Sequence, residues 1–260
     1  MLNYFAAMPH TVQALIATLF TWGVTALGAA AVFLFKRMNK TALDAMLGFS
    51  AGVMTAASFF SLLSPAMELA GELDMNAPFT VLAGFLGGGA LLSAGDALWS
   101  RLDGRGGGRR SVMLVSSITL HNIPEGLSVG VAFGSLAYGI PGATLGAALL
   151  LALGIGLQNF PEGLAVSLPL RREGASRARA FFIGQLSGAV EPIAGVAGAL
   201  LVLGVQRLLP YMLSFAAGAM IYVVVAELVP ESQANGRGSA MSAATLAGFA
   251  VMMTLDIGLG

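Results

Sequence analysis

The 260-residue sequence contains no cysteine and very little charge. The absence of cysteine excludes both a disulfide framework and a thiolate metal site. Charged residues make up only 10% of the chain, whereas soluble domains carry roughly 25%, so this chain cannot wet the surface of a soluble globule. The formal net charge of zero gives no electrostatic support to a nucleic-acid partner. These absences indicate a membrane protein whose surroundings are lipids.

What the sequence has in abundance is apolar: 57% of its residues are hydrophobic, and it contains 35 glycines and 13 methionines. Apolar runs of about 20 residues are long enough to cross a bilayer as helices. Residues 1–10 lack the basic region and cleavage pattern of a secretory signal, so we expect the first apolar run to be kept as a span. The sequence predicts an all-α transmembrane domain over residues 1–260 with eight helices, at about 11–35, 42–63, 78–98, 112–134, 142–169, 180–204, 210–229 and 240–259.

Basic residues gather in the connections after the odd-numbered spans. These connections hold twelve of the 13 lysines and arginines, and the loop at about 99–111 alone holds four arginines. The positive-inside rule therefore places these connections in the cytoplasm and both termini outside the cytoplasmic membrane. The opposite side carries Glu68, Glu72 and Asp74, which form an ordinary solvated loop or, as the less favoured alternative, concentrate cations at an entrance.

Two short segments recur along the chain. Phe49–Met54 (FSAGVM) in the second span recurs as Phe215–Met220 (FAAGAM) in the seventh, and Ala83–Phe85 (AGF) in the third recurs as Ala247–Phe249 in the eighth. Because spans two and seven run in opposite directions, the sequence predicts an inverted repeat of spans 1–3 and 6–8 around a central antiparallel pair, spans 4 and 5. Transporters with inverted repeats commonly bind their substrate near the midplane. Coincidence among small residues is the alternative.

A stronger repeat links the central pair. His121–Gly126 (HNIPEG) and Gln158–Gly163 (QNFPEG) share four of six residues. At about 100° per residue, the glutamate of each motif lies on one helix face between the first and second motif residues. This spacing predicts a binuclear centre bridged by carboxylates. Facing each other, the helices would present His121, Gln158, Glu125 and Glu162 to one ion, and Asn122 and Asn159, with the same glutamates, to a second.

Other features of the same spans support an ion site. Pro124 and Pro161 leave two helical carbonyls without their usual N–H partner, free to ligate or hydrate an ion. Glu191 in the sixth span is the next carboxylate to join the cluster, and the thioethers of Met54 and Met220 extend the range of ligands. This mixture of ligands suits Zn²⁺, Fe²⁺, Mn²⁺, Co²⁺ or Cd²⁺.

The energetic cost of the buried acids argues against a purely structural role. Each acidic residue at the centre of a span costs roughly 2.5–3.5 kcal/mol, so Glu125, Glu162 and Glu191 together cost on the order of 8–10 kcal/mol. Spans four, five and six contain no lysine or arginine within their apolar stretches. A mobile cation or a proton must therefore balance these glutamates.

HNIPEG, QNFPEG, Glu191 within SGAVEPIAG, and AELVPES at 226–232 resemble the zinc–iron permease (ZIP) family of metal transporters, and its short prokaryotic members most closely. The resemblance covers spans two to eight and implies an eight-helix importer of divalent metals, zinc foremost. It implies that Glu227 and Glu231 match an inner exit route. Position by position, it implies a primary site of His121, Glu125, Gln158 and Glu162 near Met54, and a second site of Asn122, Asn159 and Glu191 with the shared glutamates.

This sequence departs from the family pattern in two places. Some relatives have aspartate where Asn159 stands, which predicts a weaker second site here. The loop at 99–111 lacks the histidines that are frequent in the family. The roles of Asp96 and Asp256 stay open between an exit-pathway ligand and an interfacial carboxylate.

Several alternatives to a transporter remain distinguishable by experiment. An intramembrane metalloenzyme would need an open coordination position and a separate general base. A passive channel would conduct without saturating, and a metal-responsive receptor would bind without flux. The segment Gly48–Gly52 (GFSAG) matches a serine-hydrolase pattern but begins a membrane helix. We expect a transporter and not an enzyme, without a prosthetic group, with a divalent metal as substrate; its glycine-rich faces are compatible with a homodimer.

Overall fold

A computed structural model describes residues 2–34, 39–103, 110–139, 143–172, 174–204 and 206–259, and within them the side chains of 99–103 and 110–121 lie outside the description. The described residues form helices and no strands. Part of the predicted basic loop, 104–109, and the side chain of His121 therefore lie outside the described part of the chain.

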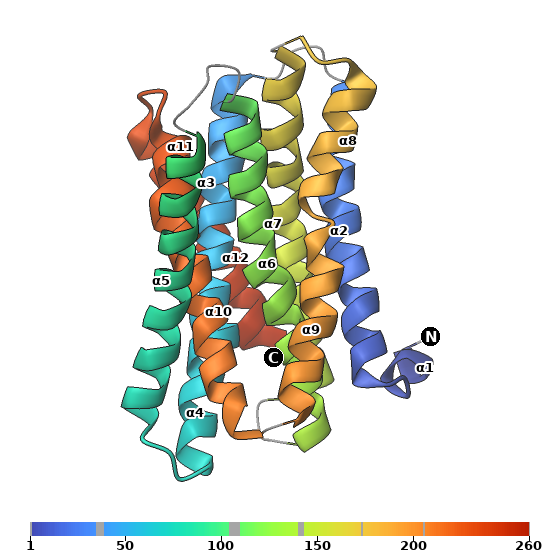
Figure 1. The fold of residues 1–260 in the computed structure, drawn as a ribbon, viewed down its shortest axis with the longest axis vertical. Coiled ribbons are helices and arrows are strands. Elements are labelled where there is room, and N and C mark those ends of the chain that lie inside the picture. Colours follow the sequence, from blue (N-terminus) through green and yellow to red (C-terminus); the bar gives the residue numbers. More distant parts are fainter. Residues whose placement is uncertain are drawn as a thin grey trace.

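The long helices lie side by side in a bundle and run roughly along its long axis (Figure 1). Two of the segments, η1 and η4, are π-helical, and η2 and η3 are short 3₁₀ turns. In chain order the elements are α1 (Leu2–Ala6), α2 (His10–Leu34), α3 (Lys40–Ala57), η1 (Ser58–Leu63), α4 (Ser64–Glu72), α5 (Ala77–Asp103), α6 (Arg110–Ser135), η2 (Leu136–Tyr138), α7 (Leu145–Arg172), α8 (Arg177–Ser187), α9 (Val190–Gly204), η3 (Gln206–Leu208), α10 (Leu209–Val223), η4 (Val224–Leu228), α11 (Val229–Gln233) and α12 (Gly238–Leu259).

Seven helical segments among the described residues are long and apolar enough to cross a membrane. The predicted fourth span corresponds to α6, which has 26 residues but carries the polar HNIPEG motif and is not one of the seven. The chain is thus a multi-pass membrane protein. The seven segments are His10–Leu34, Lys40–Glu72, Ala77–Leu98, Leu145–Leu168, Arg177–Leu203, Gln206–Gln233 and Gly238–Ile257.

Most predicted span ends differ from the helix ends by a few residues, and three spans show differences with a structural cause. The second span, predicted to end at residue 63, continues through Pro65 to Glu72, and the seventh, predicted to end at 229, continues through Pro230 to Gln233. In both, a π-helical turn precedes the proline. The sixth span, predicted as continuous over 180–204, is divided into α8 and α9 by a turn at Gly188 and Ala189.

Glycine permits the closest helix contacts, because a methyl group at these positions would collide with the neighbouring backbone. Two of these contacts involve α6 or α7, the helices that carry the paired motifs, and two join other helices. In α2–α7 and α6–α9, Gly163 lies against the Thr25 carbonyl and Gly126 against the backbone of Glu191. In α3–α12 and α5–α10, Gly248 lies against the Phe49 carbonyl and Gly88 against the Phe215 carbonyl.

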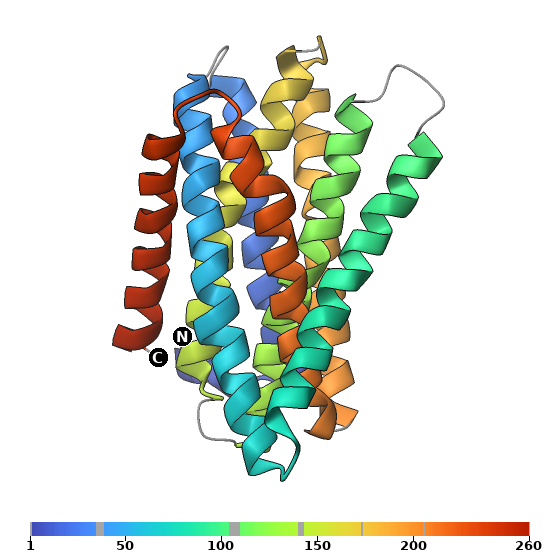
Figure 2. The ribbon, with the colours of Figure 1, turned by 90° about the vertical axis from the view of Figure 1, so that its left-hand side faces the viewer.

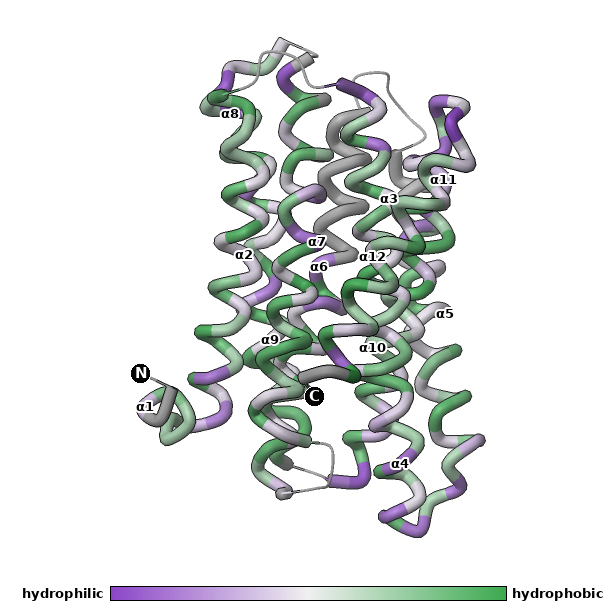
Figure 3. Tube along the Cα trace, turned by 180° about the vertical axis from the view of Figure 1, so that it is seen from behind, coloured by the Kyte–Doolittle hydropathy of each residue, from purple (hydrophilic) through white to green (hydrophobic). Residues whose placement is uncertain are grey.

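The two ends of the chain lie at one end of the bundle, as the turned view in Figure 2 shows. The opposite end holds the connections between α2 and α3, α5 and α6, α7 and α8, and α11 and α12 (Figure 1). Hydrophilic residues concentrate at both ends, and a few lie at mid-height inside the otherwise hydrophobic bundle near α6 (Figure 3). The paired motifs belong to α6 and α7.

Candidate metal centre

The two motifs meet inside the bundle. Both α6 and α7 remain helical through their motif prolines, Pro124 and Pro161. The side-chain amide of Gln158 donates a hydrogen bond from Nε2 to Oε1 of Glu125 over 2.8 Å. The two motifs are therefore in direct contact through Gln158 and Glu125, as predicted.

The polar residues of the site are almost completely withdrawn from solvent. Asn122, Glu125, Gln158 and Asn159 are 0% exposed, as is Glu191, and Glu162 is 5% exposed. Glu162 and Glu191 lie close enough to Glu125 for their charges to repel its carboxylate. Burial of like charges is costly unless a cation or a proton balances them.

Four buried oxygen atoms in this region accept no hydrogen bond: Asn122 Oδ1, Glu125 Oε2, Gln158 Oε1 and Asn159 Oδ1. All four belong to the two motifs, and all are acceptors. A buried polar atom without a partner costs about 1–3 kcal/mol, so four in one place call for an explanation. A cation supplies one, because it binds oxygen lone pairs directly.

The amide nitrogens of the same residues do have partners. Asn122 Nδ2 donates to the Ser187 carbonyl over 2.8 Å, at the end of α8. Asn159 Nδ2 donates to Oε1 and Oε2 of Glu191 over 2.9 and 3.0 Å. With the Gln158–Glu125 bond, every one of the three amides uses its N–H group on the protein and leaves its oxygen free.

Glu191 has a different environment from Glu125. It lies in the first turn of α9, directly after the break in the sixth span. Besides Asn159, its carboxylate accepts hydrogen bonds from the hydroxyls of Thr21 and, over 3.4 Å, Thr25 on α2. These threonines belong to no motif of the sequence. Their three- and four-residue spacing with Thr18, within an apolar helix, was the available signal.

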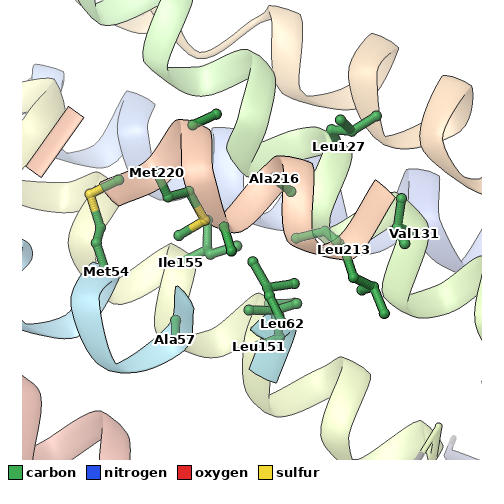
Figure 4. Close-up of a cluster of buried hydrophobic side chains, with 14 of the residues drawn as sticks. Met54, Ala57, Leu62, Leu127, Val131, Leu151, Ile155, Leu213, Ala216 and Met220 are labelled. Carbon is green, nitrogen blue, oxygen red and sulfur yellow. The ribbon is translucent and has the colours of Figure 1, made fainter. Parts of the chain in front are cut away.

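Two other predicted ligands are placed less directly at the site. The backbone of His121 lies in α6, one residue before Asn122, and its side chain is outside the described residues. Met54 is fully buried among apolar side chains, close to Met220 and Ile155 in Figure 4. Among the side chains that the structure describes, no three or more histidine, aspartate or glutamate residues are grouped closely enough to hold a metal ion.

The acidic residues of the seventh span lie beyond Met220. Glu227, in η4, is partly buried and close enough to Glu162 for their charges to interact, while Glu231 in α11 is exposed. Nearby, Tyr222 of α10 lies close enough to Ser93 and Asp96 of α5 for their side chains to interact. Asp96 thus lies where α5 faces α10.

An apolar layer lies on the other side of the site, toward the end of the bundle that holds the termini. It includes Leu127 and Val131 of α6 and Leu151 of α7, packed against Leu62 and Leu213 (Figure 4). Beyond it is a cavity of about 360 Å³ that Leu151 and Leu213 also line, together with Glu68 and Asp256. Asp256 Oδ2 accepts a hydrogen bond of 2.6 Å from Ser61. The layer therefore separates this cavity from Glu125 and Gln158.

Comparison with known proteins places this architecture in a family. The family model "ZIP Zinc transporter" matches residues 100–256. The human protein "Zinc transporter ZIP11" is 41% identical, with 95% of this chain and 97% of the relative aligned. "Zinc transporter GufA" of Myxococcus xanthus is 38% identical, over 95% of this chain and 98% of its own.

A further bacterial relative, "Zinc transporter ZIPB" of Bordetella bronchiseptica, is 37% identical over 96% of this chain and 82% of its own. The resemblance drawn from the HNIPEG and QNFPEG motifs is thus confirmed by matches that extend across nearly the whole chain. The protein belongs to the ZIP family of zinc transporters, whose members are transporters and not enzymes.

Proposed function

We propose that this protein carries divalent transition metal ions, zinc foremost and also cadmium, iron, manganese or cobalt, across the cytoplasmic membrane into the cytoplasm. The observation that supports this most strongly is the set of four buried motif oxygens without a hydrogen-bond donor. A cation would satisfy all four at once, and no lysine or arginine is present between Arg110 and Arg171 to supply one.

The proposed site has two adjoining positions. At the first, Glu125, Glu162, His121 and Gln158 replace the water of the incoming ion, with Met54 close by. At the second, Asn122, Asn159 and Glu191 act together with the two shared glutamates. Carboxylate, amide and imidazole ligands form a set that divalent first-row metals and zinc accept. Asn159, a neutral ligand, makes the second position weaker than the first.

The fold supports an inverted repeat of spans 1–3 and 6–8. The α2–α7 contact at Gly163 and Thr25 resembles the α6–α9 contact at Gly126 and Glu191. The π-helical segments η1 and η4 each begin four residues after a methionine of the repeated motif, Met54 or Met220. Two halves built alike but oriented oppositely can open the same site to one side and then to the other.

The transport cycle that we propose follows from the apolar layer. In this conformation Leu62, Leu151 and Leu213 separate the cavity near Asp256 from the site. Movement of α6 and α7, with their neighbours, relative to the remaining helices would open that path to the incoming ion and then expose the site to the cytoplasm. Carboxylates that release their ion into the cytoplasm take up protons, so transport would depend on pH.

The orientation also belongs to the proposal. The end of the bundle opposite the termini carries the connections that hold twelve of the 13 arginine and lysine residues, and the positive-inside rule assigns it to the cytoplasm. The cavity lined by Glu68 and Asp256 then faces outward, at the entrance for the ion.

Zinc uptake by proteoliposomes tests the proposal. The double variant Glu125→Ala, Glu162→Ala removes both shared carboxylates, and we expect its uptake to fall to that of protein-free vesicles. Glu72→Ala, an exposed acid at the end of α4, is the matched control and should transport like the wild type. Wild-type flux in the double variant would refute the site. Uptake that rises linearly with zinc, without saturation, would instead favour a passive channel.

A further inference from the structure

We propose that Thr21 and Thr25 of α2 are positioning residues of the second metal position, acting through Glu191 on Asn159. This inference rests on the proposed metal site and assigns to it a helix, α2, that carries none of the predicted ligands. The residues form a chain of contacts from α2 to α9 and then to α7.

The first link holds the carboxylate of Glu191. Thr21 donates to Oε2 and Thr25 to Oε1, so each oxygen has a hydroxyl on α2 as partner. Thr21, Thr25 and Glu191 are all at most 1% exposed, so water does not compete for these bonds. Each hydroxyl also has a backbone carbonyl of α2 within reach, that of Thr18 for Thr21 and that of Thr21 for Thr25. The shorter bond, from Thr21, is therefore the main restraint on the carboxylate.

The second link holds the amide of Asn159. Both carboxylate oxygens of Glu191 accept from its Nδ2, at 2.9 and 3.0 Å. The Nδ2 atom also donates to the carbonyl of Thr21 on α2 over 3.3 Å, so this nitrogen has three acceptors in all. With Nδ2 fixed in this way, Oδ1 is left as a buried acceptor without a donor. Glu191 in this conformation therefore serves to aim the Asn159 oxygen.

The local backbone is built to allow this arrangement. At the break between α8 and α9, a methyl group on Gly188 would lie 3.0 Å from Glu191 Oε1 and 3.1 Å from Thr25 Cβ. Trp22, next to Thr21, donates from Nε1 to the Gln185 carbonyl over 2.8 Å and so holds α2 against the end of α8. The break in the sixth span thus gives the carboxylate room beside the α2 threonines.

The consequence concerns affinity and selectivity. Outer partners that orient a metal ligand typically change metal affinity 10- to 100-fold when they are removed. An amide oxygen is a hard ligand that suits Mn²⁺ better than softer ions, whereas imidazole favours Zn²⁺. Loosening Asn159 should therefore weaken competition by Mn²⁺ more than competition by Cd²⁺.

The test measures zinc uptake by proteoliposomes with Thr21→Val, which removes the hydroxyl at nearly constant volume. We expect the KM for zinc to rise roughly 10-fold, the maximal rate to stay within about twofold, and inhibition by Mn²⁺ to fall relative to inhibition by Cd²⁺. Thr21→Ser, which restores a hydroxyl, should recover both values. Thr18→Val is the matched control, because Thr18 is a buried threonine on the same helix whose hydroxyl bonds only to the carbonyls of Ala14 and Leu15.

A second comparison separates positioning from stability. In an Asn159→Ala background the Thr21→Val substitution should raise KM by much less than in the wild type, since one of the two ligands that Thr21 positions is gone. Equal KM and competition profiles for Thr21→Val and Thr18→Val, or a full additive effect in the Asn159→Ala background, would overturn the inference. If Thr21→Val does not reach the membrane, Thr25→Val decides by the same criteria. Wild-type uptake that does not depend on Glu125 and Glu162 would instead refute the proposed function.

Discussion

Two buried glutamates on neighbouring helices, Glu125 and Glu191, are both 0% exposed but differ in their partners. Glu125 accepts one side-chain hydrogen bond, from Gln158, and its Oε2 has no donor. Glu191 accepts bonds at both oxygens from Asn159, Thr21 and Thr25. The protein thus compensates one carboxylate with its own donors and leaves the other without them.

This difference indicates where a cation is needed. Hydrogen-bond donors can stabilise a buried carboxylate without an ion, as they do for Glu191. At the proposed primary position, Glu125 Oε2 and Gln158 Oε1 have no donors, and oxygen atoms cannot compensate a negative charge. Under the proposed function, this is the position where a metal ion would contribute most.

Isosteric amide substitutions should separate the two carboxylates most strongly. Glu125→Gln removes a charge that binds the ion directly, and we expect zinc uptake by proteoliposomes to fall by at least about 100-fold. Glu191→Gln removes a charge from the second, weaker position but keeps an oxygen acceptor for Asn159, so it should reduce uptake by only about 10-fold. Equal losses in the two variants would show that the environments do not define different roles.

Replacing the Asn159 side-chain amide by a carboxylate should leave Glu191, like Glu125, with fewer hydrogen-bond donors. Asn159→Asp removes the donor to Glu191 and places a second carboxylate beside it, so the second position would bind a cation more tightly. Tenfold tighter binding corresponds to about 1.4 kcal/mol. In detergent, we expect the variant to melt below the wild type in the presence of a chelator and to gain more from added zinc. A zinc-induced shift equal to that of the wild type would contradict this expectation.

The smallest effect on zinc uptake is expected from an amide–carboxylate hydrogen bond that lies away from the site. Asn235 Nδ2 donates to both oxygens of Asp44 over 3.1 and 2.9 Å, joining α3 to the connection between α11 and α12. Asn235→Ala should lower the free energy of unfolding by about 1–2 kcal/mol and leave the KM for zinc within about twofold. Thermal unfolding and uptake assays measure the two quantities. A changed metal preference would mean that any amide–carboxylate contact affects the site.

The sequence was sufficient for the helical membrane class, the family and the contact of the two motifs. Apolar length and lack of charge determine the spans, and the shared Asn, Pro, Glu and Gly residues of HNIPEG and QNFPEG mark their helices as a pair. The Glu125–Gln158 hydrogen bond fulfils that pairing. Local patterns suffice here because both motifs lie on regular helices of known periodicity.

Features that depend on distant contacts could not be predicted in this way. Thr21 meets Glu191 across 170 positions of sequence, and nothing in either segment identifies the other. The extended second span was missed because proline normally ends a helix, whereas here Pro65 follows a π-helical turn and the helix continues. Met54 was predicted as a ligand from its thioether and from its match to the family pattern, and the structure packs it with apolar neighbours.

The most direct test of the central claim is equilibrium dialysis of the detergent-purified protein against labelled zinc, comparing the wild type with the Glu125→Ala, Glu162→Ala variant. If the uncompensated oxygens at the α6–α7 contact hold the transported ion, the wild type binds at least one zinc per chain and the variant binds none at the same free concentration. A wild-type protein without affinity for zinc, or a variant that binds as the wild type does, would contradict the account.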